Sequence, residues 1–227
     1  MLRIASLLAF IALASVSAKA ADIISPANYN WAGAYVGVLA GGGWGSTHPT
    51  YGGGSTATVD MSGGIAGVDA GYDWQSNSIV YGVVFDGSWA GIKGSEVGPN
   101  TPCVISGIGC TASVDWLATG RARLGVSTGR LLPYVTGGLA MGGLQGTFDS
   151  PNLACTCSAS SVQLGWTAGA GIEYAINDKF TAKLEYLYTD LGRPTIQGDN
   201  TLNAPFPGVG TGDYTFSVVR LGLNLRF

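Results

Sequence analysis

The sequence predicts an all-β fold, an eight-stranded antiparallel up-and-down transmembrane β-barrel with short periplasmic turns and long extracellular loops. Eight segments alternate between apolar and polar side chains with the period of a β-strand. The connections between them alternate between short and long, which is typical of membrane barrels. The final segment is the clearest, because its two sides differ completely: Val219, Leu221, Leu223, Leu225 and Phe227 oppose Arg220, Gly222, Asn224 and Arg226.

The eight segments are each longer than the roughly 9 to 11 residues that a tilted strand needs to cross the hydrocarbon layer. In chain order they cover approximately residues 32–44, 59–74, 79–89, 113–126, 131–145, 161–175, 179–191 and 214–227. Short turns join the second segment to the third, the fourth to the fifth and the sixth to the seventh. We expect the remaining connections to be long loops.

Charged residues lie on one side of six of these segments and apolar residues on the other. In the second segment, for example, Val68 and Tyr72 oppose Asp69 and Asp73. The complete charged set contains Asp69, Asp73, Asp86, Asp115, Arg121, Arg123, Glu173, Lys183, Glu185, Arg220 and Arg226.

Alternation alone does not say which side faces inward, because a soluble sandwich or a lipocalin shows the same period. Three other features favour the membrane orientation. All six tryptophans lie at or near segment ends, as in an interfacial aromatic girdle. The long loops exceed the usual length in compact domains. Glycine is abundant within the segments, which suggests tight curvature or a crowded interior.

The charged set is therefore predicted to face the lumen. Eight strands enclose a space just wide enough for side chains to fill. Six acids meet five bases, and charges removed from bulk water must be paired. We expect a salt-bridge network that plugs the lumen. A rival interpretation assigns the same residues to the selectivity filter of a narrow porin.

The amino terminus has the features of a secretory signal. Arg3 precedes an apolar stretch, and Ala18-Lys19-Ala20 provides a small-residue cleavage site. We expect residues 1–20 to be a cleaved signal peptide and residues 21–227 to form one outer-membrane barrel domain. Removing Arg3 and Lys19 leaves nine basic residues against fourteen acidic ones, a formal charge of −5. This balance argues against nucleic acid as a partner.

Four cysteines in an exported chain indicate disulfides. Cys103 and Cys110 fall in one expected loop, and Cys155 and Cys157 fall in the next. Two local bridges form the simplest connectivity, and of these we favour Cys103 to Cys110. A bridge between Cys155 and Cys157 would span one intervening residue and be strained, so that pair and loop-to-loop bridges stay open. A zinc site that also uses His48 is the rival. The spacing lacks a Cys-x-x-Cys pair, so we predict no metal and no cofactor.

Catalysis is not predicted. Hydrolases usually need a histidine base beside a nucleophile, and the single histidine, His48, lies before Pro49 in a Gly/Thr-rich stretch typical of a solvated loop.

Several stretches resemble the outer-membrane immunogenic protein family of Gram-negative bacteria, small eight-stranded barrels with an OmpA-like domain that are often labelled "porin family". The longest are Leu131-Leu-Pro-Tyr-Val-Thr-Gly-Gly-Leu-Ala, Gly165-Trp-Thr-Ala-Gly-Ala-Gly-Ile-Glu-Tyr, Lys183-Leu-Glu-Tyr-Leu-Tyr-Thr-Asp-Leu-Gly and Val219-Arg-Leu-Gly-Leu-Asn-Leu-Arg-Phe, with shorter matches from Trp31, Gly71 and Gly120. The resemblance implies an integral outer-membrane surface protein without a family-wide catalytic site. It also implies that Phe227 belongs to the signal read by the barrel-insertion machinery.

Two functions are consistent with these features. The first is a structural barrel that stabilises the envelope among outer-membrane lipid and lipopolysaccharide, with its loops exposed outside the cell. The second is an adhesin-like module whose loops capture an extracellular ligand or a host surface.

Overall fold

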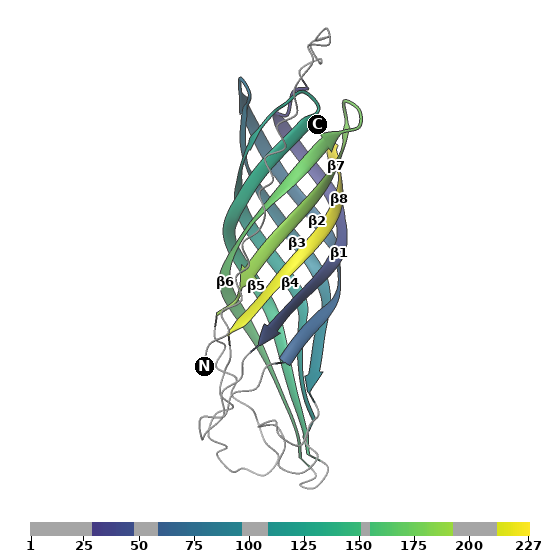
Figure 1. The fold of residues 1–227 in the computed structure, drawn as a ribbon, viewed down its shortest axis with the longest axis vertical. Helices are drawn as coiled ribbons and strands as arrows, with labels where there is room; N and C mark the ends of the chain where they lie inside the picture. The colour runs from purple at the N-terminus through teal and green to yellow at the C-terminus, as the bar shows by residue number, and fades with distance from the viewer. Residues whose placement is uncertain (1–28, 48–58, 97–108, 151–154, 193–212) are drawn as a thin grey trace, which may run out of the picture.

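Eight antiparallel strands form a closed barrel in the computed structural model, which describes residues 29–47, 59–96, 109–150, 155–192 and 213–227 (Figure 1). Each strand pairs with its neighbours in sequence, and β1 pairs with β8 to close the cylinder. Among the described residues, no helix is long and apolar enough to cross a membrane. The strands are β1 (Gly33–Thr47), β2 (Val59–Ser76), β3 (Ile79–Glu96), β4 (Gly109–Val126), β5 (Leu131–Ser150), β6 (Cys155–Ala175), β7 (Phe180–Asp190) and β8 (Tyr214–Arg226).

The strands are strongly tilted, as their pairing register shows. A row of paired residues that starts at Trp74 in β2 passes through Tyr81 in β3 and continues around the barrel to Val219 in β8. It returns to β2 at Gly64, ten residues nearer the loop end than Trp74. Rows therefore climb toward the loops from β2 to β8. Eight strands with this stagger leave an interior that side chains can fill.

The outer surface of the barrel is apolar between two aromatic rows. Trp44, Trp89, Trp116 and Trp166 lie toward the loop end, whereas Trp74, Tyr81, Tyr174 and Phe227 lie toward the short turns. Tyr81 and Trp89 are eight residues apart in β3, about 26 Å along the strand. A tilt of about 35 to 45° reduces this to about 20 Å, close to the apolar band of a membrane barrel. The predicted orientation is confirmed, with apolar side chains facing outward.

Trp31 is an exception to the predicted girdle. It lies before β1, and its side chain is fully buried in the barrel mouth rather than exposed at the membrane interface. The other five tryptophans are on the outer face of the strands, where Trp116 is half-buried and the other four are exposed.

The strands on one side of the barrel are longer than the sequence predicts. Only residues 151–154 separate β5 from β6, so the expected long loop there is wrong, and a tall hairpin projects beyond the girdle (Figure 1). Residues 146–150 and 155–161 include six Ser or Thr residues and lack clear apolar alternation. They are strands because an uninterrupted β5–β6 register pairs their backbones.

This extension also corrects the placement of three cysteines. Cys110 belongs to β4, and Cys155 and Cys157 belong to β6, instead of to loops. The structure describes the backbone of these three residues but not their side chains. Cys103, His48 and the expected signal peptide lie outside the described residues, so the disulfide and signal-peptide assignments stay predictions.

Because the outward face is apolar, a charged substitution there should destabilise the barrel by an amount that depends on its position. The side chain of Leu221 is 64% exposed between the two aromatic rows. Leu221→Arg should lower the free energy of unfolding by about 2 to 4 kcal/mol, because an arginine would face hydrocarbon. Urea titration in lipid vesicles measures the effect. Ser95→Arg, at an exposed position beyond the girdle, is the matched control and should change stability little. Equal small effects at both positions would contradict the orientation.

Candidate functional site

The lumen is filled by three successive layers of side chains. An apolar cluster closes the turn end, a charged belt occupies the middle, and a second apolar cluster fills the loop end. The turn-side cluster contains Tyr29, Trp31, Val80, Leu132, Tyr134 and Ala175. The loop-side cluster, called here the apolar plug, contains Met61, Ile65, Ala90, Ile92, Ala112, Val114, Leu117, Ala140, Leu144, Leu191, Tyr214, Phe216 and Val218.

The residues before β1 fold across the turn-side mouth. The backbone N–H of Trp31 donates to Gln75 Oε1 at 2.7 Å, and its indole N–H donates to the carbonyl of Gly129 at 3.4 Å. Tyr29 packs edge-on against Trp31 and donates its hydroxyl to the carbonyl of Asp178 at 3.2 Å. Burial raises the pKa of Tyr29, which further favours the protonated hydroxyl that donates this bond. These contacts tie the mouth to three of the short turns.

The charged belt contains ten of the eleven residues predicted to face the lumen, and all ten are buried. Five are acidic and five are basic, so the belt is electrically balanced. Its members are Asp69, Asp73, Asp86, Glu173 and Glu185 with Arg121, Arg123, Lys183, Arg220 and Arg226.

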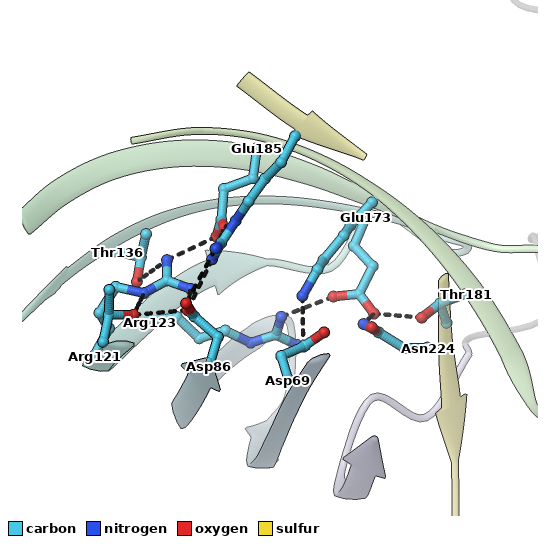
Figure 2. A network of polar contacts seen from close by, with 12 residues as sticks. Asp69, Asp86, Arg121, Arg123, Thr136, Glu173, Thr181, Glu185 and Asn224 are labelled. Atoms are coloured by element: carbon cyan, nitrogen blue, oxygen red, sulfur yellow. Dashed lines mark hydrogen bonds and ion pairs between the residues drawn. The ribbon is translucent and has the colours of Figure 1, made fainter. Parts of the chain in front are cut away.

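Four of these residues form an alternating ring, called here the central quartet (Figure 2). Arg121 bridges Asp86 at 2.7 Å and Glu185 at 2.9 Å. Arg220 bridges the same two carboxylates, at 2.9 Å from Asp86 and 2.7 Å from Glu185. The four side chains come from β3, β4, β7 and β8, and each arginine contacts both acids. The ring therefore joins opposite walls of the barrel.

A second ring of the same composition, the turn-side quartet, lies nearer the short turns. Arg123 bridges Asp73 and Glu173, the latter at 2.7 Å. Arg226 bridges the same acids, at 2.7 Å from Asp73 and 3.3 Å from Glu173. Their strands are β2, β4, β6 and β8. Each quartet holds one aspartate, one glutamate and two arginines, so each is neutral by itself.

Lys183 and Asp69 form the remaining ion pair, with 2.6 Å between Nζ and Oδ2. Lys183 is in β7 and Asp69 is in β2, so the lysine stem crosses β8 and β1. It passes over Gly222, where an added Cβ would lie 2.6 Å from Lys183 Cε. A crowded interior thus explains the glycine at this position.

Neutral side chains complete the belt. Thr119 donates to Asp86 at 2.6 Å, and Asn224 donates to Glu173 at 3.1 Å. Tyr134 donates to Glu185 at 3.0 Å while the guanidinium of Arg123 lies 5.2 Å from its ring centre. Tyr134 therefore links the two quartets. Hydrogen bonds of this kind are what buried charges require to be tolerated.

Asp115 is the residue that the structure does not bring into the belt. It is half-buried and accepts a hydrogen bond from Ser113 at 3.2 Å. The pairing register shifts between Val114 and Trp116, so Ala112 and Val114 turn inward above this point. An irregularity of one residue reverses the side on which later side chains lie, which is why simple alternation misplaces Asp115.

The apolar plug is the feature that sequence reasoning missed. The sequence-based prediction placed the apolar side of every strand against lipid. It therefore missed the apolar residues that face inward near the loop end. The signal was present in part: Met61 and Ile65 have the same parity in β2 as Asp69 and Asp73, so continued alternation places them in the lumen.

The site offers ion pairing rather than an evident catalytic group. Each carboxylate of the quartets is held by two guanidinium groups. Within the part of the chain that the structure describes, no group of three or more His, Cys, Asp or Glu residues is placed to hold a metal ion.

Comparison with known proteins points in one direction. Residues 6–227 match the family model described as the outer membrane protein beta-barrel domain. The chain is 37% identical over 242 residues to the 31 kDa outer-membrane immunogenic protein of Brucella melitensis biotype 1, covering 95% of this chain and 96% of that relative. It is 31% identical over 207 residues to a 22 kDa outer membrane protein of Rhizobium leguminosarum biovar viciae, covering 90% and 81%.

Among solved structures, the outer membrane protease OmpT from Escherichia coli aligns over 86% of this chain and 97% of its own, with a TM-score of 0.50. The two sequences are 10% identical, so this similarity shows the fold alone.

The quartet geometry predicts that removing one arginine is costly. Arg220→Met would leave Asp86 and Glu185 sharing Arg121 alone, with uncompensated negative charge in the lumen. The free energy of unfolding should fall by about 3 to 5 kcal/mol. Urea titration in vesicles measures it, with Arg130→Met on an exposed turn as the control. Adding Asp86→Asn to Arg220→Met should restore part of the loss. An unchanged midpoint for Arg220→Met would show that the belt does not stabilise the barrel.

Proposed function

The chain belongs to the outer-membrane β-barrel domain family, and from this premise we propose that it is a closed structural barrel that stabilises the outer membrane. It is an outer-membrane surface protein related to the immunogenic proteins of Brucella. In this role the filled lumen stabilises the barrel and takes no part in transport or catalysis.

The filled lumen is the observation that carries this proposal. An ion that entered from the loop end would meet the apolar plug, where its hydration shell has no replacement. Beyond the plug it would meet the two quartets, whose charges are already paired across the barrel. At the turn end, Trp31 and Leu132 are fully buried in the mouth. Three barriers of different chemistry in series disfavour the narrow-porin alternative.

The alternative of loop-mediated ligand or host-surface binding concerns residues 48–58, 97–108 and 193–212. These lie outside the described residues, so an adhesin-like role stays a prediction. The prediction that the chain is not an enzyme also involves residues outside the described ranges, because the single histidine, His48, lies in the first of them. The relatives are named as outer-membrane proteins, which supports a role without catalysis.

The proposed partners follow from the outer surface. The apolar band would contact outer-membrane lipid, and the region beyond the loop-side girdle would meet lipopolysaccharide. Phe227 is 76% exposed at the end of β8, and its backbone N–H donates to the carbonyl of Ala34 at 3.0 Å. We propose that Phe227 belongs to the signal read by the barrel-insertion machinery. If Phe227 belongs to this signal, deleting it should reduce the fraction of the protein in membranes that is folded and heat-modifiable on gels. Normal assembly of the deletion variant would contradict this role.

A closed lumen predicts that the protein conducts no ions. The full-length protein, reconstituted in planar bilayers, should show no steady single-channel current, because the charged belt and the plug both block hydrated ions. A sixteen-stranded porin tested in parallel is the positive control, and migration on unboiled gels verifies folding of the sample. Removing part of the plug with Phe216→Gly should still leave the bilayer silent, since both quartets remain. A steady conductance from the unmodified protein would contradict the proposed function.

A further inference from the structure

Beyond the membrane girdle, β6 has an edge that no described strand covers. On one side it pairs with β5 along its whole length, from Cys155 to Tyr174. On the other side, among the residues that the structure describes, its pairing with β7 covers only Trp166 to Ala175. The interval from Cys155 to Gly165 therefore has one paired edge and one unpaired edge, about 35 Å long.

Within the described residues, β7 ends two positions before Gly192. β7 ends at Asp190, and Gly192 has φ of +69°, a left-handed conformation that favours glycine. The N–H of Leu191 donates to the carbonyl of Tyr214 at 3.0 Å, and the N–H of Tyr214 donates to the carbonyl of Gly192 at 3.1 Å. These two hydrogen bonds hold residues 191 and 192 against β8.

The register identifies which backbone groups are unpaired. The N–H of Ala175 donates to the carbonyl of Arg130, on the β5 side. Backbone groups of alternate residues point to the same neighbour, so odd-numbered residues of β6 point to β5 and even-numbered residues point to the β7 side. Above Trp166, the backbone N–H and C=O groups of Ser160, Val162 and Leu164 therefore point to the open side.

The free edge lies on the loop side of the girdle. Trp116 belongs to the girdle, and its row passes through Gly143 to Val162. Because rows climb toward the loops from strand to strand, Val162 and the residues before it lie outside the apolar band. Unpaired backbone groups would be costly in hydrocarbon but are accessible to partners here.

The edge also lacks the devices that protect exposed strands. Such edges are usually blunted by charged residues, proline or a bulge. The interval from Cys155 to Gly165 contains no charged residue and no proline, and its register with β5 is uninterrupted. Val162 and Leu164 are more than 60% exposed on its outer side. Ser161 and Gln163 are half-buried on the inner side, where the Gln163 amide donates to the Ser161 hydroxyl at 2.6 Å.

We propose that this edge of β6 binds an extended, uncharged peptide segment of an extracellular partner, which adds a strand to the barrel wall. Main-chain hydrogen bonds would provide affinity, and alternation would provide specificity. Apolar side chains of the partner would lie beside Val162 and Leu164, and small polar ones beside Ser161 and Gln163. This inference goes beyond the proposed structural role and does not depend on a closed lumen.

Two other occupants fit the geometry less well. Two copies in one membrane have the same orientation, so strands tilted by about 35 to 45° would cross at roughly twice that angle instead of running side by side. A lipid chain has no groups that can bond the N–H and C=O of Val162.

The test uses the full-length protein in lipid nanodiscs and a capped probe peptide of alternating valine and threonine with one lysine at each end. Binding is measured by fluorescence anisotropy, and amide exchange is measured by nuclear magnetic resonance. Val162→Pro removes one outward N–H and leaves the β5 ladder intact, because Val162 points away from β5. Val162→Thr keeps the backbone and is the matched control. Migration on unboiled gels verifies that both variants fold.

The proposal expects the amides of Val162 and Leu164 to exchange fast in the free protein and to become protected when the peptide binds. Val162→Pro should weaken binding about tenfold or more, the equivalent of one lost hydrogen bond, while Val162→Thr should bind within about twofold of the unmodified protein. The proposal is overturned if these amides are already protected without peptide, which would place another part of the chain on the edge. It is also overturned if the peptide fails to bind or binds the folded Val162→Pro variant equally well.

Discussion

Pairing of buried charge is the constraint on which the rest of this barrel depends. Ionised side chains inside a narrow cylinder are tolerated only when opposite charges and hydrogen bonds surround them. The chain meets this requirement with two rings of identical composition, in which each arginine bridges one aspartate and one glutamate. Their members come from β2, β3, β4, β6, β7 and β8. Correct register of six strands is therefore a condition for neutrality, and a slip of one residue would turn these charges toward lipid.

The layered lumen follows from the same constraint. Charges gather in the middle, where opposite walls are close enough to be bridged, and apolar clusters cover both ends of the belt. These clusters limit the access of water, which strengthens the ion pairs between them. A barrel of this kind is held together across its interior as well as around its wall. That arrangement is consistent with the structural role proposed for the barrel.

The wall itself is uneven, and this has a separate origin. β5 and β6 continue far past the girdle, whereas β7 ends near it at Asp190. The result is a strand edge outside the membrane that retains hydrogen-bonding capacity. The lumen and this edge are structurally independent, since the belt lies between the girdles and the edge lies beyond them. The proposed stabilising belt and the proposed peptide-binding edge therefore lie at different levels of one barrel.

The sequence by itself determined the number of strands, their approximate bounds at the turn end, the outward apolar side and the ten residues of the charged belt. It could do so because strand periodicity is local: a residue and its neighbour two positions away report the same side. Only the tertiary structure decided which acid meets which arginine, because Asp86 and Arg220 are joined by barrel closure and not by sequence spacing. It also decided that Asp115 leaves the belt, that Trp31 enters the mouth and that β6 outruns β7. The first and the last of these depend on register between strands, and the position of Trp31 depends on contacts with the short turns. A single chain pattern encodes neither.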